Sequence, residues 1–170
     1  MISNKFYGTV ILSWTKSVVA ILITYFLLLV TSAPSFAQLE LRQENDSLYW
    51  LGDWRLPYPV YRFCMGDVDG DGSEEALVGV VKSTRYYKEK GRRLFIFRQV
   101  NGKARPLWMG SKLGGILQDF KYVDGGIVRS LEATTDGHYV VAEYRWDDFG
   151  LAFLRFLVKG VDRATAMQHF

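Results

Sequence analysis

Short runs of alternating apolar and polar residues, separated by turn-forming residues, fill the chain after residue 37. This alternation turns one set of side chains toward a core and the other toward solvent, and it is typical of antiparallel strands. No segment in this region keeps helical periodicity over ten or more residues, although residues 161–170 could form a short helix. The pattern therefore predicts an all-β fold of antiparallel sheets.

The strands are expected to begin with a hairpin over residues 39–51. Residues 76–81 are apolar on both faces, which predicts an inner strand of a sheet. Turn signals such as Asn101-Gly102 separate the runs. The remaining strands are expected at residues 61–65, 94–97, 120–123, 127–133, 139–146 and 151–158.

The two halves of this region resemble each other. Val68-Asp69-Gly70 matches Val123-Asp124-Gly125 at an offset of 55 residues, and Trp54 and Trp108 are 54 residues apart. Such near-equal offsets predict a duplicated unit of about four strands, with copies at about residues 54–106 and 108–160. The alternative is chance, because Asp-Gly and Trp are common at turns and strand ends.

The first 37 residues have the composition of a leader. Lys5 and Lys16 are the only charged residues there, and an apolar run at residues 18–30 follows Lys16. The run is shorter than the roughly 20 residues that a membrane-spanning helix needs. These features predict a signal peptide over residues 1–37.

Small residues at Ser35 and Ala37 predict cleavage before Gln38. Residues 38–170 would then be a single all-β extracytoplasmic domain, secreted or periplasmic. The alternative is an uncleaved membrane anchor formed by residues of about 10–32, and contact with a membrane is expected only in that case.

Charge and residue counts exclude several classes of function. Without Lys5 and Lys16, 19 of the 21 basic residues remain against 18 acidic ones, so no nucleic acid partner is expected. Cys64 is the only cysteine, which excludes an internal disulfide framework. The two histidines, His138 and His169, have no nucleophile or metal ligand at a recognisable spacing. No catalytic residue is assigned.

One loop concentrates negative charge between two apolar strands. Asp67, Asp69 and Asp71 stand at alternate positions, and Gly70 and Gly72 let the chain curl so that the carboxylates converge. Calcium is a hard cation that binds six to eight oxygen atoms, which suits this spacing. The alternative is an acidic turn that binds no ion.

The flanks of the loop exclude a helix–loop–helix calcium site. Such a site places a bidentate glutamate at the twelfth position of its loop. Here that position is Val78, inside an apolar strand, and both flanks are strand-like.

Residues 66–79 resemble the calcium loops of the integrin-type FG-GAP repeats and the related VCBS repeats of extracellular β-propellers. In that family a D-x-D-x-D-G-x-x-D loop joins two strands and binds Ca²⁺. Glu75 replaces the usual final aspartate, and Asp124-Gly125-Gly126 in the second unit is too reduced for an ion to be expected there. The resemblance implies the calcium ligands Asp67, Asp69, Asp71, Ser73 through its carbonyl, and Glu75.

The resemblance also implies propeller-blade-like units. A closed propeller needs at least four blades, and 133 residues are too few for them. The chain is therefore expected to fold as two blade-like units and to be a monomer or dimer, because an open sheet edge invites a partner strand. A protomer that completes a ring by assembly is the alternative.

The function implied is that of an exported calcium-binding β-module, with structural calcium, that recognises a protein or glycan partner. Enzymatic activity is not expected, because no catalytic set is arranged in the sequence. The alternative is a small extracytoplasmic enzyme, or an accessory subunit of a glycan-active enzyme. Its cleft would be lined by Trp50, Trp54, Trp108 and Trp146.

The leader assignment predicts that the exported protein begins at Gln38, because Ser35 and Ala37 satisfy the signal peptidase. N-terminal sequencing of exported material tests this. Recovery of a Met1 start in a membrane fraction would support the anchor instead.

Overall fold

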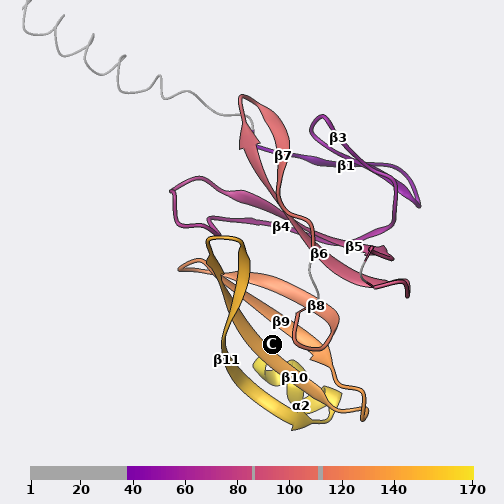
Figure 1. Ribbon diagram of the computed structural model, residues 1–170, viewed down its shortest axis with the longest axis vertical. Helices are drawn as coiled ribbons and strands as arrows, with labels where there is room; N and C mark the ends of the chain where they lie inside the picture. The colour runs from indigo at the N-terminus through magenta and orange to yellow at the C-terminus, as the bar shows by residue number, and fades with distance from the viewer. Residues whose placement is uncertain (1–37, 86, 111–112) are drawn as a thin grey trace, which may run out of the picture. The chain divides into compact units, whose positions relative to one another are not determined.

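The computed structural model describes residues 38–85, 87–110 and 113–170, so the leader lies outside the described residues. Within them, eleven strands form three antiparallel sheets and one short helix follows the last strand (Figure 1). The sheets do not close into a barrel, and the predicted all-β fold is confirmed. The same residues contain no helix with the length and apolar content needed to cross a membrane.

The first sheet contains three short strands. The predicted opening hairpin is present as β1 (Leu41–Asn45) and β2 (Leu48–Leu51). A third strand, β3 (Trp54–Leu56), pairs with β2. Its three residues are too few to show an alternating pattern, which is why the sequence did not reveal it.

The central sheet follows in simple up-and-down order. It consists of β4 (Val60–Gly66), β5 (Glu75–Lys82), β6 (Gly91–Val100) and β7 (Lys103–Trp108). As predicted from its two apolar faces, β5 is an inner strand, paired with β4 on one side and β6 on the other.

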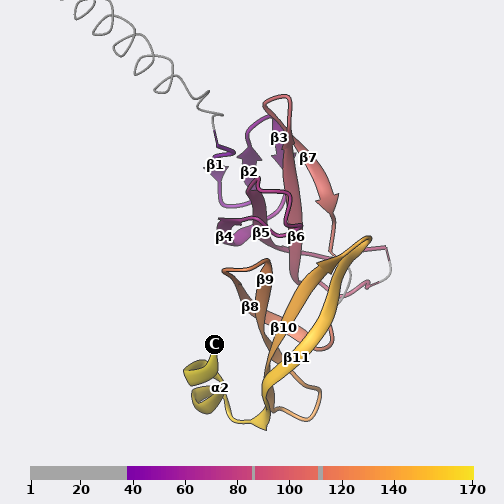
Figure 2. The same cartoon turned by 90° about the vertical axis from the view of Figure 1, so that its left-hand side faces the viewer.

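The third sheet repeats this order with four strands. They are β8 (Ile116–Val123), β9 (Ile127–Ala133), β10 (Tyr139–Asp147) and β11 (Gly150–Val161). The chain ends in the helix α2 (Arg163–His169), which lies beside this sheet (Figure 2). Asp162 caps the helix by accepting a hydrogen bond from Thr165 N at 3.0 Å, so a short helix is confirmed.

The central sheet is buried on both faces. Leu77 of β5 packs in a core with Phe120 and Val128 of the third sheet. Its neighbour Val78 points the other way, into a core with Leu51 of the first sheet. The central sheet is therefore the middle layer between the other two.

The helix α2 covers the opposite face of the third sheet. Ala166 is fully buried there in a small cluster with Leu131 and Val141. The adjacent residues Val141 and Ala142 of β10 therefore pack in two different cores, as Leu77 and Val78 of β5 do.

Two glycines let the third sheet approach the central sheet closely. A Cβ atom on Gly66 would overlap the ring of Tyr122. A Cβ atom on Gly79 would lie 2.7 Å from Tyr61 Cζ and 2.8 Å from Phe120 Cε1. All three rings belong to the core between the two sheets and have little room to move.

We predict that Gly79→Ala lowers the free energy of unfolding by about 1–3 kcal/mol, because the added methyl group overpacks this contact. Urea unfolding measures the change. Gly91→Ala on β6 is the matched control: its Cβ would meet the mobile end of Arg93 at 3.0 Å, and we expect a change within about 0.5 kcal/mol. Equal losses in the two variants would contradict the prediction.

Candidate metal centre

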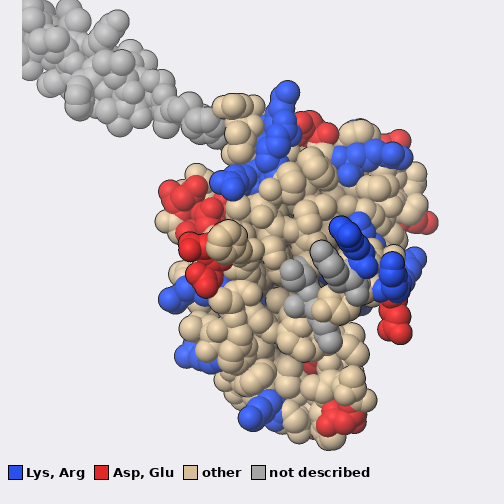
Figure 3. All heavy atoms as spheres, viewed as in Figure 1, with Lys and Arg blue, Asp and Glu red and all other residues tan. Residues whose placement is uncertain are grey.

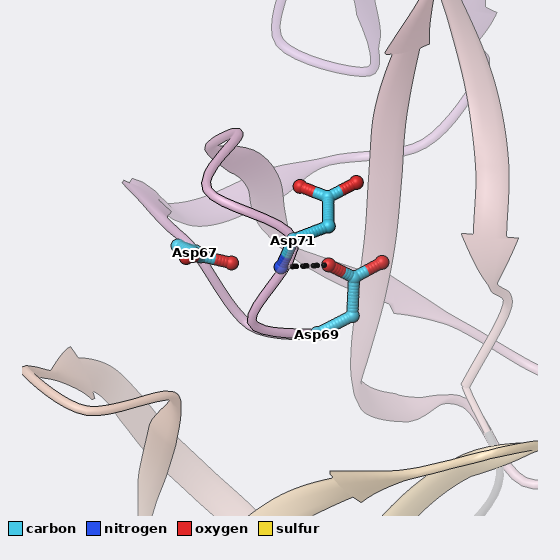
Figure 4. Close-up of side chains that lie close together, drawn as sticks. All are labelled: Asp67, Asp69 and Asp71. Atoms are coloured by element: carbon cyan, nitrogen blue, oxygen red, sulfur yellow. Dashed lines mark hydrogen bonds between the residues drawn. The ribbon is translucent and has the colours of Figure 1, made fainter.

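Three of the predicted ligands come together in the loop between β4 and β5. Asp67, Asp69 and Asp71 each offer one carboxylate oxygen, and these oxygens lie within 4.8 Å of one another (Figure 4). Asp67 and Asp69 are half-buried and Asp71 is exposed. In Figure 3, acidic side chains gather at the edge of the molecule where Figure 1 places this loop.

Backbone N–H groups of the loop hold these carboxylates in place. Asp67 accepts hydrogen bonds from Gly70 N at 2.8 Å and Gly72 N at 3.1 Å. Asp69 accepts from Asp71 N at 3.2 Å. Both glycines have positive φ, 79° and 89°, so the tight curl that brings the carboxylates together depends on glycine.

Glu75 takes a different position from the three aspartates. It is 1% exposed at the start of β5, and its Oε2 accepts a hydrogen bond from Val68 N at 2.9 Å. Burial raises the pKa of Glu75 to about 7, and the negative charges of Asp69 and Asp71 act in the same direction. Glu75 thus fixes the start of the loop from inside, and it is not part of the three-carboxylate group.

The neighbouring residues are exposed. Ser73, predicted to offer its carbonyl, donates its N–H to Asp71 Oδ1 at 2.7 Å. Glu74 accepts a hydrogen bond from the side chain of Gln38 and is not part of the three-carboxylate group.

The spacing of the three aspartates is compatible with one bound ion. Calcium–oxygen distances are about 2.3–2.6 Å, so two ligands of one calcium ion can be no more than about 5.2 Å apart. The 4.8 Å spread of the carboxylate oxygens falls within this limit. The donor set is made entirely of oxygen, as a hard cation requires.

The turn between β8 and β9 lies against this loop. The Tyr122 hydroxyl donates to Asp67 O at 3.2 Å and accepts from Gly126 N at 3.3 Å. At the 55-residue offset Tyr122 corresponds to Asp67, so the second copy carries a phenol where the first carries a carboxylate. The repeat in the sequence aligns Tyr122 with Asp67, but the contact between these two residues depends on how the sheets pack.

Two cavities lie elsewhere. One, of about 330 Å³, is lined by residues of the third sheet that include Glu132, Tyr144 and Phe153. The other, of about 430 Å³, lies beside the basic connection from β5 to β6 and includes Lys88 and Lys90.

Neither cavity contains a tryptophan, so the cleft expected for the enzyme alternative is not found at either place. Trp54 packs in the core between the first and central sheets. Trp108 and Trp146 pack against the core between the central and third sheets. Trp50 donates its indole N–H to Glu44 at 2.5 Å.

The fold and this loop define an all-β protein of three layered sheets with a carboxylate loop between two strands. No protein-family model, no curated protein and no solved structure matches the chain. Its function must therefore be argued from its own residues.

We predict that Glu75→Ala lowers the free energy of unfolding by about 1–3 kcal/mol in the presence of a chelator, because the buried Val68 N–H loses its acceptor. Glu75→Gln keeps a side-chain oxygen for this bond and should lose less. Urea unfolding of both variants measures the difference. If the two are equally destabilised, the hydrogen bond to Val68 N has no role in fixing the loop.

The raised pKa of Glu75 also predicts a pH dependence. The folded state holds this proton more tightly than the unfolded state, whose pKa is near the ordinary 4.5. The resulting stabilisation is full below pH 4.5 and is lost as pH rises through about 7. In chelator, wild-type stability should therefore fall relative to Glu75→Gln across that interval in urea unfolding. Parallel pH profiles would contradict this.

Proposed function

We propose that the protein is an exported calcium-binding β-module that recognises a protein or glycan partner outside the cytoplasm. The observation that carries the proposal is the convergence of Asp67, Asp69 and Asp71 within 4.8 Å in a loop between two strands. The role of calcium in this proposal is structural.

The choice of calcium follows from the donors and from the family resemblance. Three carboxylates bring strong negative charge to one point and leave coordination positions for a backbone carbonyl and water, as calcium accepts. The spacing of residues 66–79 resembles FG-GAP and VCBS loops, in which Ser73 and Glu75 would also contribute. Glu75 would have to turn from Val68 N, or share its carboxylate between that N–H and the ion.

Calcium at this loop would stabilise more than the loop. Asp67 and Val68 connect it to Tyr122 and Gly126 of the third sheet: a Cβ on Gly126 would lie 3.3 Å from Val68 O. An ion that neutralises the aspartates removes their mutual repulsion, and its binding free energy adds to the stability of the folded state.

Partner recognition is the remaining part of the proposal. It is supported by the edge of the third sheet, where β11 pairs with β10 and with no other strand of the described residues. Phe149 beside this strand is 95% exposed and Leu154 is 44% exposed. Exposed apolar side chains on an unpaired edge are typical of surfaces that bind another molecule.

We predict that calcium raises the melting temperature of the purified protein. At a free concentration 100 times the dissociation constant, binding adds about 2.7 kcal/mol, which corresponds to a rise of roughly 5–10 °C for a domain of this size. Asp69→Ala removes one carboxylate and should lose most of the rise. Thermal unfolding followed by circular dichroism measures it.

Asp124→Ala is the matched control, because Asp124 corresponds to Asp69 in the shortened second loop. This variant should keep the calcium-dependent rise. If a chelator leaves the wild-type melting curve unmoved, the loop is an acidic turn and the proposed function is wrong.

A further inference from the structure

A second buried carboxylate, on β9, has no positive partner in the part of the chain that the structure describes. Glu132 is 1% exposed, and no Lys, Arg or His among the described residues forms an ion pair with it. The contrast with Glu143 on β10 is direct: that carboxylate is 2% exposed and is paired with both Arg129 and Arg155. Leaving a buried negative charge without a cation is costly.

Neutral donors satisfy part of this carboxylate. Ser130 donates to Oε1 at 2.6 Å and Gly115 N donates to Oε2. The Tyr144 hydroxyl accepts from Gly114 N at 3.1 Å, which leaves its own hydrogen for Oε1 at 2.8 Å. A carboxylate has about four acceptor positions, so one remains open, on Oε2.

This carboxylate lies at the wall of the cavity of about 330 Å³ in the third sheet. The cavity is within the size range of small-molecule sites, at its lower end. Three aromatic rings line it, those of Tyr144, Phe153 and Phe156, and Val140 adds a further apolar wall. Gly114 and Gly115 also line the cavity, beside the carboxylate, where a Cβ atom would lie 3.5 Å and 2.9 Å from Glu132 Oε2, respectively.

Irregular pairing places two of these rings together. Phe153 and Phe156 are an odd number of residues apart on β11, so a regular strand would turn them to opposite faces. Register shifts in the pairing of β10 with β11 correct this, and Phe153 lies opposite Tyr144 while Phe156 lies opposite Ala142. The two ring centroids are 4.7 Å apart, and Phe153 meets Tyr144 edge-on at 6.0 Å.

We propose that this cavity binds a small organic ammonium compound with an apolar group. The ammonium would use the open position of Glu132, and the apolar group would lie between Phe153, Phe156 and Tyr144. Aromatic faces attract cations, and Lys159 already holds its ammonium 5.7 Å from the centroid of Phe156.

Among the residues that the structure describes, no cationic side chain takes this role. Arg129 and Arg155 are bound to Glu143, and Glu143 points to the face opposite its neighbour Tyr144. Lys159 remains at the outer rim and makes no ion pair with Glu132. In this proposal a ligand supplies the positive charge that the described side chains do not bring to Glu132.

The test compares 2-phenylethylammonium with 2-phenylethanol, its neutral counterpart, on the purified full-length protein. NMR titration in saturating calcium follows the signals of Gly115, Tyr144 and Phe153. We expect these signals to shift with the ammonium compound and its affinity to exceed that of the alcohol at least about tenfold. Equal affinities, which would also result if Lys159 neutralised Glu132 in solution, would overturn the proposal.

Variants separate the cavity from the acidic loop, which also attracts cations. Glu132→Gln should lower the affinity for 2-phenylethylammonium at least about tenfold. Should Glu132→Gln fail to fold, Phe156→Ala takes its place, because Phe156 is 48% exposed and its loss is tolerable; it should also weaken binding. The control Phe149→Ala removes a ring outside the cavity and should not.

The Asp69→Ala variant distinguishes this proposal from the calcium proposal. It should bind 2-phenylethylammonium as well as the wild type does, whether or not the loop binds calcium. Loss of amine binding in Asp69→Ala, with full binding in Glu132→Gln, would place the amine at the acidic loop and overturn the proposal.

Discussion

The burial of the central sheet on both faces is the constraint on which the rest of the structure depends. Successive residues of β5 serve different cores: Leu77 packs toward the third sheet and Val78 toward the first. Residues Leu94 and Phe95 of β6 divide in the same way. Because both faces of β5 are buried, neither face can be polar, and the polar and charged groups lie at the two ends of the strand. The acidic loop lies at one of these ends, and the basic connection to β6 lies at the other.

This arrangement explains why the loop is so well defined. Its first residue follows Gly66, which lies against the ring of Tyr122, and the hydroxyl of that ring reaches Asp67 O. Its end is fixed by Glu75, whose buried carboxylate returns to Val68 N. The aspartates are therefore positioned by contacts with the core between the central and third sheets, before any ion is considered. Positioning of this kind reduces the ordering that a bound ion would otherwise require.

The sequence predicted those parts that depend on local pattern. The two apolar faces of residues 76–81 identified an inner strand, and the spacing of Asp67, Asp69 and Asp71 identified the carboxylates that converge. It did not reveal β3, which is too short for a pattern, or the role of Tyr122, which requires the packing of two sheets. Glu132 was missed for the same reason: a charged residue in a strand resembles a solvent-facing position, and only the fold shows that it is buried.

The protein treats buried carboxylates in three physically different ways. Burial works to raise the pKa of Glu143, but hydrogen bonds from Arg129 and Arg155 outweigh it, so the pKa lies below its usual value. Glu75 accepts hydrogen bonds from backbone N–H groups of the loop, and burial raises its pKa to about 7. Glu132 has three neutral donors and an aromatic cavity beside it. The charge of Glu143 is balanced by two arginines of the protein itself, and that of Glu75 can be neutralised by a proton. At Glu132, the donors of the described residues are all neutral dipoles, so in our proposal a cation that enters the cavity gains an attraction that these residues leave unused.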